Sequence, residues 1–334
     1  GTLDVPSVPL KRNYRTVLQG AFGGIESTFV NQPFSVSLDK EWEGDENETF
    51  TPGIVITTAG GQITTNQLND AFNARTDGKV IISGPLDDAN LALISQWVRN
   101  RTGAAITLDL NTATGFTALP RQAFDRCGLL VSVILPPALE AIGEMAFMSS
   151  GLVEIDIPDG VTTFGEGAFN GCTSLKRVKL PKNLTTISDQ MFSKCTSLTG
   201  ITLPATVKTI GNSAFRNSGL KTIILPESVE YISQQAFACM FDYILFESTL
   251  PMNNSPQEGN IAIGTGVFSA GESGEAGSTL ILLPNINTEE VAKTYYNNIK
   301  YSRPEARIYY KYNSGGNGDR TDTANYTEYT EPAQ

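Results

Sequence analysis

The stretch AFNGCTSLKRVKLP, residues 168–181, recurs in altered form along the middle of the chain and decides its fold. Its Ala-Phe landmark, with Met191 in place of alanine before Phe192, returns at steps of 23, 22, 23, 23 and 22 residues, at Phe124, Phe147, Phe169, Phe192, Phe215 and Phe237. A second landmark, an apolar residue followed by proline, keeps the same period at Pro136, Pro158, Pro181, Pro204 and Pro226. Two landmarks with one period indicate a tandem repeat.

Each repeat unit predicts a short strand closed by a proline. Val178 and Leu180 lie two residues apart and therefore share one face of a strand. Pro181 has no N–H to donate and ends the strand, and Gly171 or its neighbours turn the chain before it. A unit of this length cannot bury its own apolar face, so the units must stack into one core with a parallel sheet. Six rungs at about 4.8 Å make a slab roughly 25–30 Å long.

The sequence before the repeats predicts a helical cap. Residues 79–84 and 105–110 have the composition of strands, and residues 87–101 between them have that of a helix. Asp87 or Asp88 can cap this helix. Its apolar stripe consists of Leu91, Ile94, Trp97 and Val98. A second short helix is predicted over residues 67–75.

The sequence after the repeats predicts an irregular cap. Residues 251–277 form an insertion rich in Gly, Asn, Ser and Glu, which displaces the next landmark to Phe268. A strand is expected at residues 280–284, a closing helix at 289–296 and a closing strand at 306–312. Repeat arrays need such caps because their end units would otherwise expose apolar faces.

Composition excludes many kinds of chemistry. The 334 residues include no histidine, which removes Ser-His-Asp and Cys-His catalysis, zinc or haem sites that need His, and the usual proton shuttle near pH 7. Lys plus Arg number 24 and Asp plus Glu 35, a net charge of −11, which argues against nucleic-acid or anionic-membrane partners. No apolar run approaches the roughly 20 residues of a membrane helix. We expect no enzymatic activity, no cofactor and no metal.

The repeat resembles the BspA-like leucine-rich repeats of bacterial surface proteins. Leu175, Val178, Leu180 and Pro181 carry the pattern apolar-x-x-apolar-x-apolar-Pro, and Ala214-Phe215 carries its Ala-Phe pair. The match is firm over about residues 118–250 and loose over 54–117 and 251–312. The resemblance implies a right-handed leucine-rich-repeat solenoid, of α/β or mainly-β class, with adhesion at a bacterial surface as its role.

A second resemblance concerns the start of the chain. Residues 11–20 and 34–39 look like the closing strands of a fimbrillin-like β-sandwich, a domain of outer-surface lipoproteins and pili. This implies a location outside the cell or on its outer surface, as a secreted or lipid-anchored precursor. A start without Met fits a processed or truncated chain.

The chain is thus divided into three parts. Residues 1–52 form the fimbrillin-like β segment, residues 53–312 the leucine-rich repeat domain, and residues 313–334 a polar tail. An added edge strand is expected within residues 324–330 of this tail.

The candidate binding site is the outward side of the predicted sheet. Rung by rung, the pairs of outward positions include Glu154 with Asp156, Arg177 with Lys179, and Tyr243 with Leu245. An acidic rung beside a basic one predicts the cross-strand pairs Glu154–Arg177 and Asp156–Lys179. The predicted binding residues are Asp109, Glu154, Asp156, Arg177, Lys179, Thr202, Thr222 and Tyr243.

Other chemically suggestive residues have plainer explanations. Cys127, Cys172, Cys195 and Cys239 follow the landmark phenylalanines in one column and are expected to be small core residues. Glu154 and Asp156 could suggest a glycosidase, but a flat sheet offers no cleft and neighbouring cations would keep both ionised. The loops at residues 39–48 and 313–322 resemble calcium loops only superficially and are expected to be solvated.

Function is expected to lie in binding. The favoured hypothesis is a non-catalytic cell-surface or secreted protein that contacts a protein, or another macromolecule of a host or bacterial surface, through the outward sheet. One alternative is a glycan-binding module that uses the tyrosines crowded into residues 295–312. Another is a pilus or surface-assembly component, suggested by residues 1–52.

Overall fold

The computed structural model divides the chain into two compact units, residues 1–52 and 53–334. It describes residues 15–16, 38–39, 55–58, 62–74, 77–239, 241–248, 252–253, 261–269, 281–283, 288–299, 306–310 and 322–330. In the first unit, β1 (Arg15–Thr16) pairs antiparallel with β2 (Leu38–Asp39). The rest of the fimbrillin-like segment lies outside the described residues.

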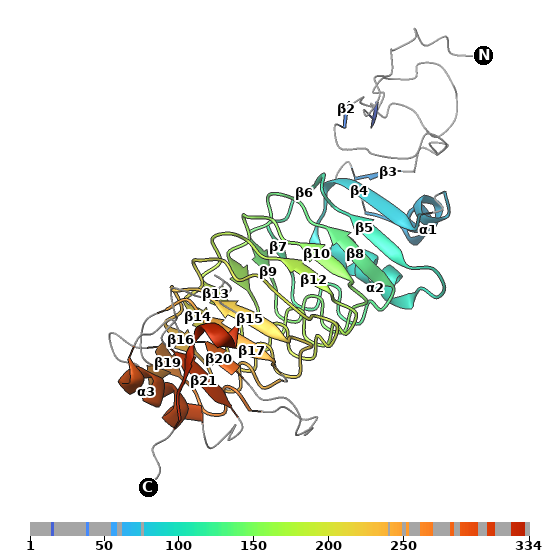
Figure 1. The fold of residues 1–334 in the computed structure, drawn as a ribbon. Helices are drawn as coiled ribbons and strands as arrows, with labels where there is room; N and C mark the ends of the chain where they lie inside the picture. The colour runs from blue at the N-terminus through green and yellow to red at the C-terminus, as the bar shows by residue number, and fades with distance from the viewer. Residues whose placement is uncertain are drawn as a thin grey trace, which may run out of the picture. The chain divides into compact units, whose positions relative to one another are not determined.

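The second unit is a stack of rungs that place short strands on two sides (Figure 1). We call the first series the front sheet; its strands run parallel and pair in three groups, of which the first is β3–β4–β5–β8, the second β10–β12 and the third β15–β17–β20–β21. Their bounds are β3 (Val55–Thr57), β4 (Lys79–Pro85), β5 (Ile106–Asp109), β8 (Leu130–Ile134), β10 (Glu154–Asp156), β12 (Arg177–Lys179), β15 (Thr222–Leu225), β17 (Tyr243–Phe246), β20 (Ile281–Leu283) and β21 (Arg307–Tyr310).

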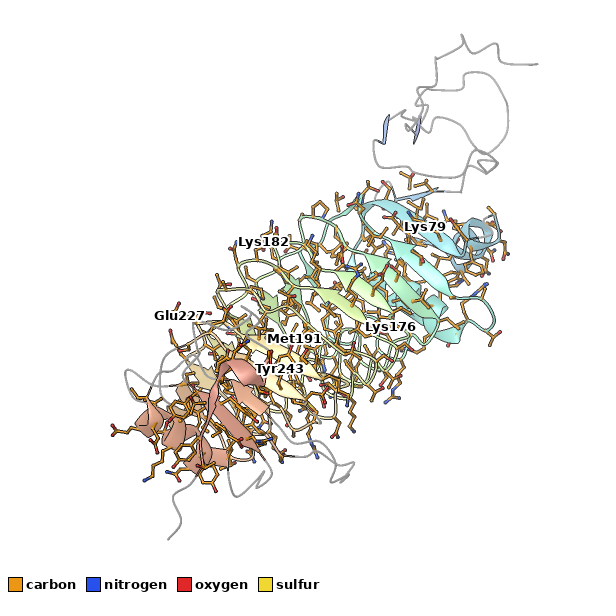
Figure 2. All side chains as sticks on the ribbon, in the orientation of Figure 1. Lys79, Lys176, Lys182, Met191, Glu227 and Tyr243 are labelled. Atoms are coloured by element: carbon orange, nitrogen blue, oxygen red, sulfur yellow. The ribbon has the colours of Figure 1, made fainter. Side chains whose placement is uncertain are left out.

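The second series is the back sheet, built of shorter parallel strands. They are β7 (Ala118–Leu119), β9 (Ala141–Ile142), β11 (Thr163–Phe164), β13 (Thr186–Ile187), β14 (Thr209–Ile210), β16 (Tyr231–Ile232) and β19 (Ile261–Ile263). Two further strands flank the sheets: β6 (Ala113–Thr114) pairs with β4, and β18 (Met252–Asn253) pairs with β19. Side chains fill the space between the sheets; Met191 is fully buried there, whereas Lys182 and Glu227 are exposed at the rim (Figure 2). The predicted array of short parallel strands is confirmed.

A column of phenylalanines runs through the core. All seven landmark rings, from Phe124 to Phe268, are stacked on their neighbours with centroids 5.4–6.1 Å apart and planes within 17° of parallel. Phe268 stacks on Phe237 at 6.1 Å, so the landmark displaced by the insertion is where the sequence predicted it. Each inner ring therefore contacts a ring above and a ring below.

The chain turns sharply on both sides of the landmarks from Phe124 to Phe215, and before Phe237 and Phe268. The residues two before and two after Phe169 are Gly167 and Gly171, with φ of +63° and +72°. In the next rung, the same left-handed positions are Gln190 and Lys194. Glycine fits this conformation without strain, so the predicted turn at Gly171 is confirmed.

Unit length varies because the turn before the front strand has two forms. In the longer units two residues follow the cysteine, as in Cys172-Thr173-Ser174-Leu175. In the shorter units a single glycine stands there, at Gly151 and Gly219. The Gly219 N–H donates to the Cys195 carbonyl at 3.0 Å, and a Cβ on Gly219 would lie 2.1 Å from the Thr196 carbonyl oxygen. Only glycine permits this approach without a shift.

The amino-terminal cap contains α1 (Thr65–Asn73) and α2 (Asp88–Asn100). Thr64 and Gln67 form a capping box at the start of α1, and Asp87 accepts from the Asn90 N–H at 2.7 Å at the start of α2. All four residues of the predicted α2 stripe are buried. Both helices were predicted from the sequence.

The carboxyl-terminal cap adds a helix and one reversed strand. Both α3 (Glu289–Ile299) and β21 lie where the sequence predicted a closing helix and a closing strand. After a 3₁₀ turn, η1 (Thr323–Asn325), the strand β22 (Thr327–Glu328) pairs antiparallel with β21. This pairing covers the backbone groups of β21 that a further parallel rung would use.

Candidate functional site

The outward side of the front sheet, called the front face below, carries the candidate site. Strand residues alternate between core and solvent, so Ile155 of β10 and Val178 of β12 are buried while their neighbours are exposed. Among the described residues, three large apolar side chains are exposed on this face, Val55 at 47%, Ile134 at 39% and Ile224 at 48%. Ile134 and Ile224 stand on either side of the charged rungs β10 and β12, and an exposed apolar residue rimmed by charge is typical of an interaction surface.

One arginine organises the charged centre. Arg177 Nη2 lies 3.0 Å from Glu154 Oε2, and Arg177 Nη1 lies 2.6 Å from Asp156 Oδ1. The hydrogen bond that Arg177 donates to Asp156, followed by those that it donates to Glu154, raises the pKa of the Arg177 guanidinium above its ordinary value. The first predicted cross-strand pair is therefore present. The second is wrong, because Arg177 spans both carboxylates and Asp156 contacts it rather than Lys179.

The remaining predicted charges are placed differently. Lys179 is exposed and has no ion pair with a described residue. Asp109 lies 2.7 Å from Lys79 Nζ and accepts from the Asn111 N–H at 3.0 Å, and its side chain is only 14% exposed. Asp109 thus holds neighbouring rungs together and is a weak candidate for contact with a partner.

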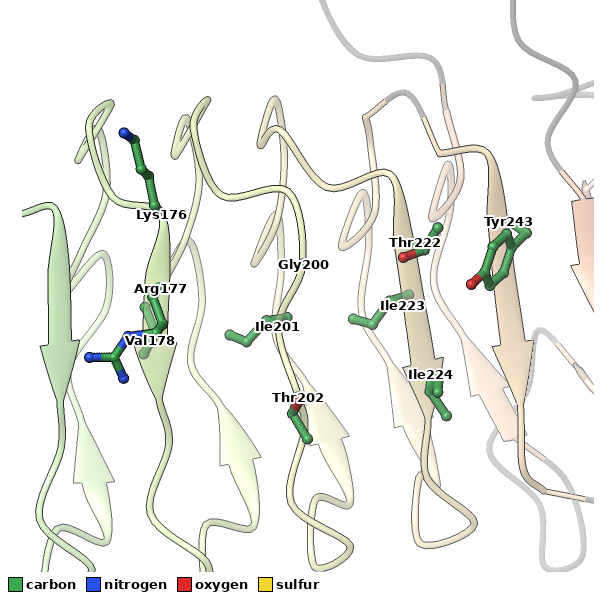
Figure 3. Close-up of a pocket in the computed structure, with 10 residues that line it drawn as sticks. All are labelled: Lys176, Arg177, Val178, Gly200, Ile201, Thr202, Thr222, Ile223, Ile224 and Tyr243. Atoms are coloured by element: carbon green, nitrogen blue, oxygen red, sulfur yellow. The ribbon is translucent and has the colours of Figure 1, made fainter. Parts of the chain in front are cut away.

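Two hollows mark the front face, each at an interruption of the strand pairing. The first, of about 460 Å³, lies where β8 and β10 are not paired, and Ile134, Glu154, Asp156, Arg177 and Lys179 are among its lining residues. The second, of about 360 Å³, lies between β12 and β15 (Figure 3). We call them the Ile134 hollow and the Gly200 hollow.

The Gly200 hollow exists because one rung has no outward side chain at its centre. Arg177 and Thr222 occupy the equivalent positions on β12 and β15, and Gly200 stands between them (Figure 3). Among the described residues, no backbone hydrogen bond joins residues 200–203 to either neighbouring strand. Gly200 does not have a positive φ, and a Cβ placed on it would meet nothing within 4 Å. Neither backbone conformation nor packing therefore requires glycine here.

The front face ends where the chain's own carboxyl-terminal segment covers it. Tyr326 packs against Leu245 of β17 and Tyr309 of β21, and Tyr243 lies partly buried against this cluster. Arg307 Nε donates to Glu328 Oε1 at 2.6 Å, and Arg307 Nη2 contacts Glu328 Oε2. The interpretation of Leu245 as an exposed outward residue is therefore wrong: Leu245 is 4% exposed because Tyr326 covers it.

The predicted site residues fall into two groups and one outlier. Glu154, Asp156, Arg177 and Lys179 meet at the Ile134 hollow, whereas Thr202, Thr222 and Tyr243 line the Gly200 hollow beside Arg177. Asp109 stands apart, as described above. Sequence reasoning missed Gly200 as a feature of the site, although a glycine at an outward strand position was itself the available signal.

The cysteine column is structural. All four cysteines are buried thiols outside any disulfide. Cys172 Sγ donates to the Phe147 carbonyl at 2.9 Å, and Cys195 Sγ donates to that of Phe169 at 3.2 Å. Burial raises the pKa of the Cys127 and Cys172 thiols to about 11 and also raises that of Cys195. Thiols with raised pKa values are poor nucleophiles.

This shift predicts alkaline lability. In the unfolded chain the Cys172 thiol ionises above about pH 9, whereas in the folded protein it stays protonated to about pH 11. The contribution of the neutral thiol to the free energy of unfolding is therefore fully present below pH 9. It is lost as the pH rises to 11, which lowers the free energy of unfolding by roughly 2–3 kcal/mol. When urea unfolding is measured at intervals from pH 8 to 11, the free energy of unfolding should fall less steeply with pH for Cys172→Ala than for the wild type. Equal slopes would contradict the assignment.

The described residues also limit other site chemistries. In that part of the chain, no three His, Cys, Asp or Glu side chains gather as a metal site would need. Of the helices described, none has the length and apolar character to cross a membrane.

Comparisons with known proteins agree with the repeat. The family model for the BspA type leucine rich repeat region matches residues 117–241 in six copies. The leucine-rich repeat protein of T. pallidum is 30% identical over 50% of this chain and 77% of its own, with a TM-score of 0.42. The chain therefore belongs to the BspA-type leucine-rich repeat proteins.

Two further solved structures share less sequence with the chain. A leucine-rich repeat protein from Bacteroides ovatus is 20% identical over 83% of this chain and 84% of its own, with a TM-score of 0.36. A leucine rich cell surface protein from Faecalibacterium prausnitzii is 18% identical over 59% and 75%, with a TM-score of 0.26. No curated protein matches the chain, and none of these comparisons supports the fimbrillin-like resemblance of residues 1–52.

Proposed function

We propose that the front face binds a protein partner outside the bacterial cell, and that the chain acts without catalysis as a secreted or lipid-anchored surface protein. The observation that carries the proposal is the pairing of each hollow with an exposed isoleucine, Ile134 in one and Ile224 in the other. Protein interfaces typically combine apolar anchors in pockets with a polar surround.

The charges between the hollows suit recognition. Arg177 is already bound by two carboxylates, so its guanidinium is fixed in place before any partner arrives. Lys179 next to it is free to contact a partner's carboxylate. Fixed and free charges side by side give selectivity, because a partner with the wrong sign meets repulsion.

Charge reversal tests this proposal. The wild type, the double variant Arg177→Glu with Lys179→Glu, and a back-sheet control, Lys208→Glu, are compared on a panel of immobilised extracellular-matrix proteins. Lys208 forms an exposed ion pair with Glu230 at 2.8 Å beside the back sheet. Lys208→Glu therefore also replaces an exposed cation by an acid, but away from the front face. Binding by the front-face variant should fall about tenfold or more, while the control stays close to wild type.

Binding that survives the front-face reversal would place the partner elsewhere on the molecule. The same proteins on a glycan array separate the competing function: hits on glycans, with none on proteins, would replace a protein partner with a carbohydrate. Circular dichroism of each variant confirms that the fold is retained, since exposed ion pairs contribute little to stability.

A further inference from the structure

The Gly200 hollow adjoins a place where the front face already holds a peptide segment. Tyr243 lines the hollow and also packs against the cluster in which Tyr326 covers Leu245. In that cluster, the aromatic side chain of Tyr326 rests on outward apolar residues. Two residues along the segment, the Glu328 carboxylate binds the outward Arg307 through both of its oxygens. The chain therefore shows on its own surface which chemistry this face accepts.

The Gly200 hollow offers the same two kinds of contact. At one end Lys176 is exposed (Figure 3). Lys221 is also exposed; it immediately precedes Thr222, and its N–H donates to the carbonyl of Thr199, the residue before Gly200. Neither lysine has an ion pair with a described residue. The rung next to that of Lys221 carries an acidic residue, Asp242. Tyr243 lies level with Thr222 on the next strand, and the exposed Ile224 lies two residues further along β15 (Figure 3). Lysines next to an aromatic ring and a branched apolar side chain suit a segment that carries a carboxylate close to an aromatic or branched side chain.

The floor of the hollow is open to a backbone. Gly200 leaves the centre without a side chain, and residues 200–203 have backbone groups that no described strand pairs. A glycine inside a strand weakens it and often marks a place where a ligand or another backbone approaches closely. Neither the turn chemistry nor the packing requires glycine at this position.

We propose that the Gly200 hollow binds an extended acidic protein segment that carries an aromatic side chain. The carboxylate lies toward Lys176 and Lys221, and the aromatic ring lies on Ile224 and Tyr243. This rests on the proposed function, because it names the kind of partner for the same face. The adjacent contact of Tyr326 and Glu328 is the built-in precedent.

A synthetic peptide with the sequence of residues 322–331, DTANYTEYTE, is the probe. With a fluorescent label, it should bind the full chain with a Kd of about 0.1–1 mM, as short flexible ligands do. Changing Glu328 and Glu331 of the peptide to Gln should weaken binding several-fold. Added salt should weaken it too, since exposed charges are screened.

The decisive variant is Gly200→Val. A Cβ at this position meets nothing, so the variant should fold, and its side chain should fill the hollow and reduce peptide binding at least fivefold. Thr163→Val, at an exposed position of the back sheet, is the matched control and should bind as the wild type does. Thermal unfolding of both variants confirms that they are folded.

Two outcomes would overturn the proposal. The first is no binding of the peptide to the wild type. The second is binding that is insensitive to Gly200→Val, which would mean that the peptide exchanges with the chain's own segment on β21. Either outcome leaves the front face as a protein-binding surface if the reversal of Arg177 and Lys179 still abolishes binding to a matrix protein. If the reversal of Arg177 and Lys179 also leaves binding to the matrix protein unchanged, both proposals are wrong.

Discussion

Replacing Phe169 with alanine is expected to destabilise the protein by about 3–5 kcal/mol. The ring is fully buried and stacks on Phe147 at 5.4 Å and on Phe192 at 5.5 Å. Removing it leaves a cavity bounded above and below by rigid rungs that cannot close on it, so both the transfer and the cavity contributions are lost. Urea unfolding followed by circular dichroism measures the change.

The conservative variant Phe169→Leu keeps most of the volume and should cost markedly less, about 1–2 kcal/mol. A loss of under 1 kcal/mol for Phe169→Ala would contradict the view that the stacked rings hold the rungs together. Because each rung contacts only its neighbours, the variant is also expected to unfold in two transitions, one for each side of the defect. Hydrogen exchange would locate the early transition at the rungs around residue 169.

The second large effect is expected from a single methyl group on Gly219. A Cβ there would lie 2.1 Å from the Thr196 carbonyl oxygen and 2.8 Å from its carbonyl carbon. Both are backbone atoms that cannot swing aside, so Gly219→Ala must push two rungs apart. We expect a loss of about 3 kcal/mol, toward the upper end of the usual cost of overpacking.

Gly200→Ala is the matched control, since the same substitution in the adjoining rung places its Cβ where nothing lies within 4 Å. Its effect should stay within about 0.5 kcal/mol, the range of ordinary surface substitutions. Thermal unfolding of the two variants side by side measures the contrast. Similar losses at both glycines would mean that contact with the preceding rung does not explain the short units.

The periodicity of the sequence predicted most of this fold, because every repeat unit shows the same pattern of buried and exposed positions. The landmark phenylalanines, the short strands and the stripe of α2 all follow from spacing alone. The buried cysteine column followed from the same stacking argument, because equivalent positions of a stack share one environment. The landmark at Phe268 could be found beyond the insertion because its ring still stacks on that of Phe237.

The site was predicted less well, because its details depend on contacts outside the period. Leu245 was expected to be exposed, but Tyr326, which follows some eighty residues later, covers it. Asp156 was expected to pair straight across with Lys179, but the forked guanidinium of Arg177 reaches both carboxylates. Neither result can be read from alternation, which fixes the side of the sheet for a residue but not its partners.

The stacked rings also bear on how such a chain can change over generations. Every inner unit presents to the next one the same surface that it receives from the previous one. A duplicated stretch of 22 or 23 residues would therefore pack well against both the preceding and the following unit. It would lengthen the front sheet by one strand spacing, about 4.8 Å. Such a chain can acquire new surface by copying whole rungs, while the residues that face outward diverge without disturbing the column behind them.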